Sequence, residues 1–176
     1  KITRCVILNM RGIIRRFPAY EVDEYGEVFH IKTGRQLPQY HTNKGHTFVV
    51  LKVGHRWVSQ WVHRLVAQCF VINPRPDAFF DVDHIDQDPH NNHHSNLRYL
   101  TRQLNALNSS SLGCHFNKRT KRWDARLFMD RKSRLLGTFK TFLEGHRVYK
   151  AARTALFNRI YTNMVSEGPH TPEFLS

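Results

Sequence analysis

Alternation of apolar and polar residues, in short runs broken by glycines, constrains the fold of residues 17–60 more than any other feature. It occurs in "YEVDEYGEVFHI", "KTGRQL" and "TFVVLKVGHRWVSQWV". Because neighbouring side chains of a strand point to opposite faces, the pattern predicts an antiparallel β meander. The glycines at the breaks, which predict turns, are Gly26, Gly34, Gly45 and Gly54.

The hydrophobic period changes after this stretch. In "VHRLVAQCFV", apolar residues recur at helical spacing, which predicts a short helix with one face packed on the sheet. Pro74 and Pro76 would end the helix and its connection. We therefore expect a first, β-rich module over residues 1–76.

The next stretch reads as strand, polar loop, strand and helix: "DVDHI", "DQDPHNNHHSN", "LRYLT" and "RQLNALNSS". Thr101 is a candidate N-cap, which would place Asn105 near the start of the helix. We expect a small core of two strands and one helix over residues 77–112.

Alternation returns after "NSSSLG", in "CHFN", "RWDARLFM" and "RLLGTF". The segment "TFLE" has the form of a capping box, with Thr141 as N-cap and Glu144 three residues later, and a periodic apolar stripe follows it. These patterns predict a three-stranded sheet plus a helix over residues 113–160, with a loosely held tail over 161–176. The whole chain is expected to be α+β.

Charge indicates the class of partner. Lys and Arg number 27 against 14 Asp and Glu, a formal net charge of +13 with a pI near 10.2. A surplus of this size attracts polyanions and favours double-stranded DNA as the partner; charge that merely keeps the chain soluble is the alternative. No apolar run approaches the roughly 18 residues of a membrane span, so no membrane is expected. Cys5, Cys69 and Cys114 form no paired-cysteine metal motif.

The polar stretch from Asp81 to Asn108 gathers carboxylates, imidazoles and amides in this basic chain. Asp83 and His84 at a strand end could serve one site, and Asp83 with Asn105 offers the oxygen ligands that Mg²⁺ accepts. His84 could take a proton from water. The same composition also suits a hydrophilic surface loop rich in turns, and residue chemistry leaves both interpretations open.

The segments "VDHID", "SNLRYLT" and "LNALN" together resemble the HNH endonucleases, especially phage homing enzymes of the ββα-metal (His-Me finger) superfamily, over roughly residues 17–108. In that family, the residue before the first His binds the metal, that His is the general base, a middle Asn braces the loop, and a last His or Asn binds the metal. The resemblance places these roles on Asp83, His84, Asn96 and Asn105.

The resemblance implies a site-selective DNA endonuclease with one Mg²⁺ or Mn²⁺ per site, leaving 5′-phosphate and 3′-hydroxyl ends. A monomer would nick one strand, whereas a double-strand break would need a dimer or two events. It also implies the cytoplasm of a phage-infected bacterial cell. The alternatives are a catalytically inactive, sequence-specific DNA-binding regulator and an RNA-binding protein.

The chain departs from the family pattern in two places. Leu104 stands where many relatives have Glu, and "QDPHNNHH" replaces a shorter turn after "HID". We expect the additional loop histidines, His90, His93 and His94, to be solvated and not to bind the metal. The loop aspartates, Asp86 and Asp88, are expected to form turns, and His63 of the predicted helix is expected to be structural.

Residues 113–134 hold eight Lys or Arg against two Asp. Alternation would set Arg122, Asp124 and Arg126 on one face of a strand and Trp123, Ala125 and Leu127 on the other. The pattern of Trp123, Gly137, Phe139, Tyr149 and Ala152 resembles the ethylene-response-factor (APETALA-type) DNA-binding domain, although Gly145 and His146 replace its usual Ala pair. The DNA contacts implied by this resemblance are Arg119, Lys121, Arg122, Arg126 and Arg134.

Overall fold

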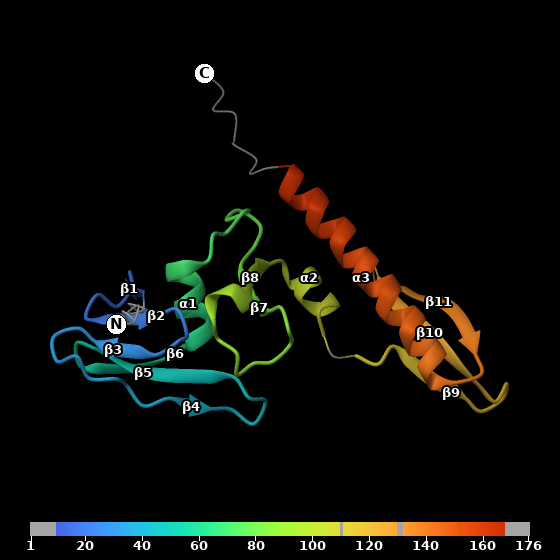
Figure 1. Ribbon diagram of the computed structural model, residues 1–176, viewed down its shortest axis with the longest axis horizontal. Coiled ribbons are helices and arrows are strands. Elements are labelled where there is room, and N and C mark those ends of the chain that lie inside the picture. The colour runs from blue at the N-terminus through green and yellow to red at the C-terminus, as the bar shows by residue number, and fades with distance from the viewer. Residues whose placement is uncertain (1–9, 110, 130–131, 168–176) are drawn as a thin grey trace, which may run out of the picture. The chain divides into compact units, whose positions relative to one another are not determined.

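The computed structural model describes residues 10–109, 111–129 and 132–167 (Figure 1). The chain divides into two compact units, one ending at Arg102 and the other beginning at Gln103. Helices and antiparallel sheets occur together, which confirms the mixed class expected from the sequence. None of the helices in the described part is long and apolar enough to span a membrane.

The first unit contains two three-stranded antiparallel sheets. One has the order β1-β2-β3, formed by Arg11–Ile13, Tyr20–Asp23 and Val28–His30. The other has the order β4-β5-β6, formed by Tyr40–His41, Thr47–Val53 and Arg56–Trp61. The single meander expected from alternation is therefore two sheets, because the chain between Ile31 and Gln39 carries only one isolated bridge, Phe29 to Gln36.

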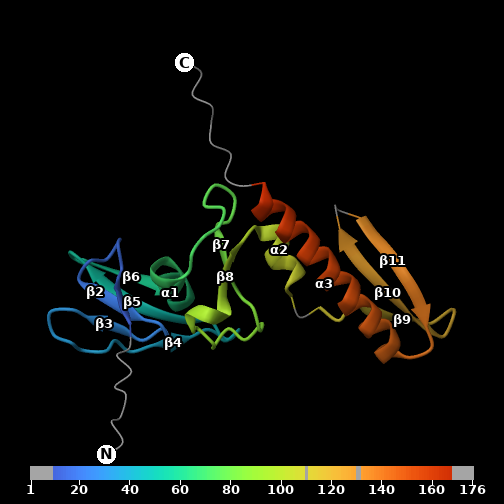
Figure 2. The same cartoon turned by 45° about the horizontal axis from the view of Figure 1, so that its top comes forward.

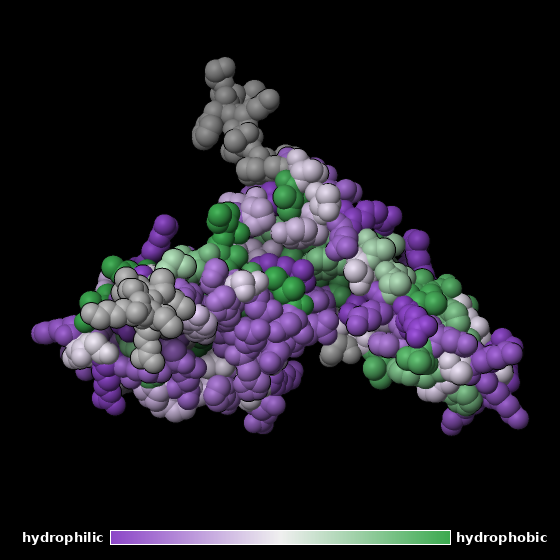
Figure 3. Space-filling model, in the orientation of Figure 1, coloured by the Kyte–Doolittle hydropathy of each residue, from purple (hydrophilic) through white to green (hydrophobic). Residues whose placement is uncertain are grey.

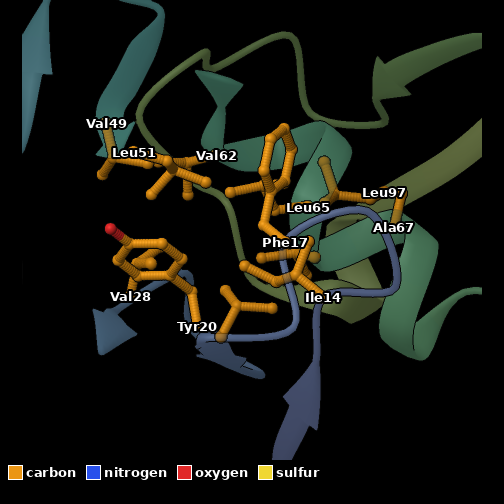
Figure 4. Packing of buried hydrophobic residues seen from close by; sticks show 12 residues of the cluster. Ile14, Phe17, Tyr20, Val28, Val49, Leu51, Val62, Leu65, Ala67 and Leu97 are labelled. Carbon is orange, nitrogen blue, oxygen red and sulfur yellow. The ribbon is translucent and has the colours of Figure 1, made fainter. Parts of the chain in front are cut away.

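Helix α1 (Val62–Phe70) covers these sheets with its apolar side. Val62, Val66 and Leu65 are almost fully buried against side chains of β2, β3 and β5 (Figure 4). This confirms the helix predicted from the periodicity of residues 62–70. The strand and loop residues of the same core are Ile14, Phe17, Tyr20, Val22, Val28, Val49 and Leu51.

A two-stranded antiparallel sheet follows, made of β7 (Asp81–His84) and β8 (Leu97–Leu100), with a one-turn 3-10 helix, η1 (His94–Asn96), before β8. Helix α1 contacts β7, β8 and η1 as well as the N-terminal strands. Leu97 joins the same buried cluster. Because α1 packs on both sets of strands, the expected module boundary at residue 76 falls inside one compact unit.

The second unit contains α2 (Arg102–Leu107), whose first residue closes the first unit, and a sheet of order β11-β10-β9. Its strands are β9 (Cys114–Asn117), β10 (Arg122–Met129) and β11 (Lys132–Phe139). The long helix α3 (Phe142–Ser166) packs on all three strands and runs beside β10 in both Figure 1 and Figure 2. Ala125, Tyr149, Leu156 and Phe157 are buried in this unit.

The start of α3 is the predicted capping box. Thr141 Oγ1 accepts from the backbone N–H of Glu144 at 3.3 Å, and Glu144 Oε2 accepts from the Thr141 N–H at 3.2 Å. The helix continues to Ser166, so residues 161–166, expected in a tail, are helical. Residues 168–176 of that expected tail lie outside the described residues.

Gly113 permits the close approach of the chain to α3. Its φ is +63°, and a Cβ built there would lie 2.2 Å from the Tyr149 ring. Trp123 packs edge-on between Phe116 and Phe142, with ring centroids 5.4 and 5.2 Å away. Trp123 therefore packs between the sheet and α3.

Candidate active site

The end of β7 brings two adjacent candidate site residues into the interior of the first unit. Asp83 and His84 are 7% and 6% exposed. They pair with Arg98 and Leu97 of β8 in the antiparallel register. Both expected residues, a carboxylate and an imidazole, thus lie at the start of the polar loop 85–93.

Asp83 is held by a cation from the neighbouring strand. Arg98 Nε donates to Asp83 Oδ2 at 2.9 Å, and a second guanidinium nitrogen lies 2.9 Å from the same oxygen. Arg98 keeps about a quarter of its side chain exposed, at 23%. The arrangement compensates a buried carboxylate and directs one of its oxygens toward Arg98.

The His84 ring is surrounded by other polar rings and one amide. Its Nε2 lies 3.2 Å from Oδ1 of the buried Asn92. The His63 ring of α1 meets it nearly edge-on with centroids 5.1 Å apart, and the His46 ring is 6.0 Å away. His63 is buried and packed, as expected from the sequence.

Burial also keeps the neighbouring imidazoles uncharged. The pKa of His63 is lowered from 6.5 to about 3, first by burial and then by the nearby His84 and His46. The pKa of His46 is lowered in the same way, by burial and then by His84 and Lys44. At neutral pH the two rings beside His84 are therefore neutral packing partners.

Asn96 connects the two ends of the polar loop. Its Nδ2 donates to Asp86 Oδ1 at 2.9 Å and to the Asn91 carbonyl oxygen at 2.8 Å. Its Oδ1 accepts from the Asp86 backbone N–H at 3.1 Å. The backbone carbonyl of Asn96 accepts from Ile85 N–H at 2.8 Å. Asn96 thus contacts the loop through both the nitrogen and the oxygen of its side-chain amide.

The loop aspartates form turns, as the sequence predicted. Asp86 Oδ1 accepts from the Asp88 N–H at 2.8 Å, and Asp88 Oδ1 accepts from the His90 N–H at 3.0 Å. Although partial desolvation opposes it, the hydrogen bonds that Asp86 accepts from the Asp88 N–H and from the Asn91 and Asn96 side chains lower the pKa of Asp86. Asp86 therefore stays ionised and serves as a hydrogen-bond acceptor within the loop.

Turns of the N-terminal sheets support the loop from outside. The backbone N–H of His94 donates to the Glu24 carbonyl oxygen at 2.9 Å, and the rings of Tyr25 and His93 lie 4.9 Å apart. Gly45, with φ +84°, lies so close to His90 that a Cβ would be 2.9 Å from His90 Nε2. The N-terminal sheets therefore support the site as well as forming a core.

Asn105, the other expected metal ligand, lies on α2, in the second unit, and is partly exposed. Within the described residues, no group of three or more His, Cys, Asp or Glu is arranged to hold a metal. One carboxylate and one amide oxygen nevertheless match a hard divalent cation, which often takes one or two protein ligands and leaves the rest to water and phosphate. The donor chemistry of Asp83 and Asn105 fits such an ion.

Comparison with known proteins identifies the segment that carries this geometry. Residues 60–107 match the family model described as HNH endonuclease. The residues that match are termed the HNH segment. It contains α1, the hairpin of β7 and β8, the polar loop and α2.

Relatives and a solved structure agree with this match. The H-N-H endonuclease F-TflII of Escherichia phage T5 is 32% identical over 91 residues, 52% of this chain and 47% of that protein. The DNA endonuclease I-HmuI of Bacillus phage SP01 is 35% identical over 94 residues, 53% of each chain. The chain thus spans about half the length of these relatives.

The solved structure reported as DNA binding and cleavage by the HNH homing endonuclease I-HmuI superposes with a TM-score of 0.51 at 32% identity, covering 56% of each chain. The similarity extends over more of the chain than the HNH segment itself.

Downstream of the HNH segment, the sheet of the second unit separates the expected DNA contacts. Arg122 and Arg126 share one face of β10 with Asp124. The Asp124 carboxylate accepts hydrogen bonds from Thr138 Oγ1 at 2.8 Å and from Asn117 Nδ2 at 3.1 Å. Arg119 and Lys121 lie in the turn between β9 and β10. On the face that Figure 3 displays, this unit mixes hydrophobic and hydrophilic side chains.

Arg134 lies elsewhere. A bulge between Ala125 and Arg126 leaves Leu136 unpaired, so Arg134 pairs with Leu127. Leu127 and Arg134 line a hollow with residues of α3, on the helix side of the sheet. Because paired residues share a face, the structure does not bring Arg134 together with Arg122 and Arg126.

Three residues of the HNH segment touch the site without having been singled out as functional from the sequence. These are Arg98 beside Asp83, and Asn92 and His63 beside His84. Strand pairing could have suggested Arg98, because an antiparallel hairpin of β7 and β8 places Arg98 opposite Asp83. The contact of Asn92 depends on how the loop folds back, and no local pattern distinguishes Asn92 from Asn91.

Proposed function

We propose that the chain is a divalent-metal-dependent DNA endonuclease that hydrolyses one phosphodiester bond at the site of Asp83 and His84. One observation carries the proposal: the segment that matches the HNH family buries this Asp-His pair at the end of β7. DNA as substrate is supported by the solved relative, which is reported to bind and cleave DNA.

In the proposed reaction, His84 accepts a proton from a water molecule. The resulting hydroxide forms a bond to phosphorus as the bond from phosphorus to the 3′ oxygen breaks. The 3′ oxygen takes a proton from solvent, so the products carry a 5′-phosphate and a 3′-hydroxyl. His84 is buried beside the uncharged His63 ring.

Asp83 and Asn105 would hold the cation, Mg²⁺ or Mn²⁺, one ion per site. Bound there, the ion would supply positive charge to the phosphate and the departing oxygen. Arg98 would keep the Asp83 carboxylate in place by occupying Oδ2. Asn96 would maintain the loop that carries His84, through its contacts to Asp86 and Asn91.

We further propose that residues 113–160 bind duplex DNA in the manner of an ethylene-response-factor domain. The support is a three-stranded antiparallel sheet backed by a helix. Trp123 and Leu127 of β10 face that helix, so strand alternation puts Arg122 and Arg126 on the opposite face. A basic ribbon of this kind can follow a groove of DNA. One site per chain implies that a monomer nicks one strand.

Supercoiled plasmids carrying a random or phage-derived insert library test the proposal. The purified chain is incubated with Mg²⁺ or Mn²⁺, and relaxed products are isolated and sequenced at their ends. We expect nicks at a restricted set of sequences, none with EDTA, and a rate reduced by about 100- to 10,000-fold in His84→Ala, the range of a lost general base.

His55→Ala is the matched control, since His55 is an exposed imidazole in the turn between β5 and β6. It should cleave like the unaltered chain. Tight, sequence-specific binding without cleavage in any divalent ion would instead support a DNA-binding regulator and would overturn the proposal.

A further inference from the structure

The contact between His84 and Asn92 determines which atom of the His84 ring can accept a proton. The two side chains are 6% and 5% exposed, and Nε2 of the ring lies 3.2 Å from Oδ1 of the amide. A buried hydrogen bond of this kind has one donor and one acceptor, so the two atoms cannot both be acceptors.

The other end of the Asn92 amide shows which atom is the donor. Asn92 Nδ2 lies 3.2 Å from the backbone carbonyl oxygen of His90, and the Asn92 backbone N–H donates to the same oxygen at 3.0 Å. A carbonyl oxygen accepts and does not donate, so the amide must turn its NH₂ group toward His90. Oδ1 then faces His84 and accepts, which requires a hydrogen on Nε2.

A neutral imidazole carries one hydrogen, and with that hydrogen on Nε2 the lone pair for proton transfer is on Nδ1. We propose that Asn92 is the positioning residue of His84: it holds the ring as the Nε2–H tautomer and makes Nδ1 the atom that accepts the proton. This inference rests on the proposed nuclease function for its catalytic meaning, but the tautomer itself does not.

The surroundings of Asn92 prevent the amide from turning away. Gly26, with φ +100°, packs on it so closely that a Cβ there would lie 3.1 Å from Asn92 Cβ and 2.7 Å from Val62 Cγ1. The His63 ring packs nearly edge-on against the His84 ring, with centroids 5.1 Å apart. Neither ring nor amide can therefore rotate without displacing a buried neighbour.

Long-range proton–nitrogen NMR correlation reads the tautomer directly, in the metal-free and DNA-free chain at pH 8. The signals of His84 are assigned by their loss in His84→Gln. In the unaltered chain we expect Nε2 to resonate as a protonated nitrogen and Nδ1 as an unprotonated one. Asn92→Asp keeps an acceptor and should keep this pattern, whereas Asn92→Leu should give a mixture of tautomers or the Nδ1–H form.

Asn91→Leu is the matched control for the spectrum, since it removes the neighbouring amide of the same loop and should leave the His84 tautomer unchanged. In single-turnover cleavage of the plasmid library, Asn92→Leu should be about 10- to 100-fold slower, the usual cost of losing an orienting partner, with unchanged plasmid binding. If Asn92→Leu does not fold, the spectrum of Asn92→Asp still tests whether an oxygen acceptor at position 92 keeps the hydrogen on Nε2 of His84.

An Nδ1–H tautomer in the unaltered chain would overturn the inference, and so would an unchanged His84 spectrum in a folded Asn92→Leu. The expected tautomer in a chain that cleaves no DNA would leave the positioning contact standing and would reject the proposed function. The two claims therefore fail separately.

Discussion

Arg98 donates to Asp83 across the β7–β8 hairpin, with Nε and a second guanidinium nitrogen each 2.9 Å from the single oxygen Oδ2. The carboxylate is 7% exposed. An ionised carboxylate at this depth needs a cationic or hydrogen-bonding partner, and Arg98 is that partner, from the paired strand. Removing Arg98 should therefore affect stability as well as chemistry.

Arg98→Ala should lower the free energy of unfolding by about 1–3 kcal/mol, because it leaves a buried charged acceptor without this donor. In an Asp83→Asn background the same substitution should cost less, giving a coupling energy of about 1 kcal/mol or more. Denaturant unfolding of the four proteins measures it. Arg102→Ala, which removes an exposed arginine nearby in sequence, should stay within about 0.5 kcal/mol of the unaltered chain. Additive effects of the two site substitutions would contradict the pairing.

Acid should destabilise the protein through His63. Its pKa is lowered from 6.5 to about 3, first by burial, so below pH 6.5 the unfolded chain takes up a proton that the folded chain does not. The free energy of unfolding should fall as pH drops from about 6.5 toward 3, with His63 contributing up to about 1.4 kcal/mol per pH unit. Thermal unfolding followed across this range should show a shallower fall in His63→Leu. His55→Leu, at the exposed turn, should keep the original slope; if both variants share it, His63 is not the group responsible.

The sequence predicts the parts of this fold that depend on neighbouring residues. The helix over residues 62–70 and the capping box of Thr141 and Glu144 follow from periodicity and spacing within a few positions. The face of Arg134 does not, because the bulge at Leu136 shifts the register by one residue and turns the side chain to the other side of the sheet. The same holds at the site, where the choice of Asn92 over Asn91 as partner of His84 depends on how the turns at Glu24 and Gly45 hold the loop.

DNA binding should distinguish the two faces of the second unit's sheet. Arg126→Ala removes a cation from the face opposite α3, so it should weaken binding and reduce the slope of log affinity against log salt by about 0.9 for a lost phosphate contact. Arg134→Ala removes the same group from the helix side and should leave the slope unchanged. Fluorescence anisotropy with duplex DNA over a salt series measures both. Equal losses in the two variants would contradict the assignment of faces.

Gly113 should tolerate no side chain. Gly113→Ala combines a positive φ with an overlap on the Tyr149 ring, so it should destabilise the second unit by more than about 1 kcal/mol. Gly34→Ala separates the two causes, because Gly34 has a similar φ of +65° with nothing within 4 Å of its added Cβ. Unfolding monitored by tryptophan fluorescence should show the larger loss for Gly113→Ala and partial recovery when Tyr149→Ala is added. Equal losses at the two glycines would show that the ring contact is unimportant.

The chemistry of the cleaved ends, compared between the unaltered chain and His84→Ala, tests the central claim most directly. If the site around Asp83 and His84 hydrolyses the bond to the 3′ oxygen, DNA ligase should seal the nicks made by the unaltered chain without prior end repair, and His84→Ala should make almost none. Nicks that ligase cannot seal, or equal nicking by His84→Ala, would contradict the account.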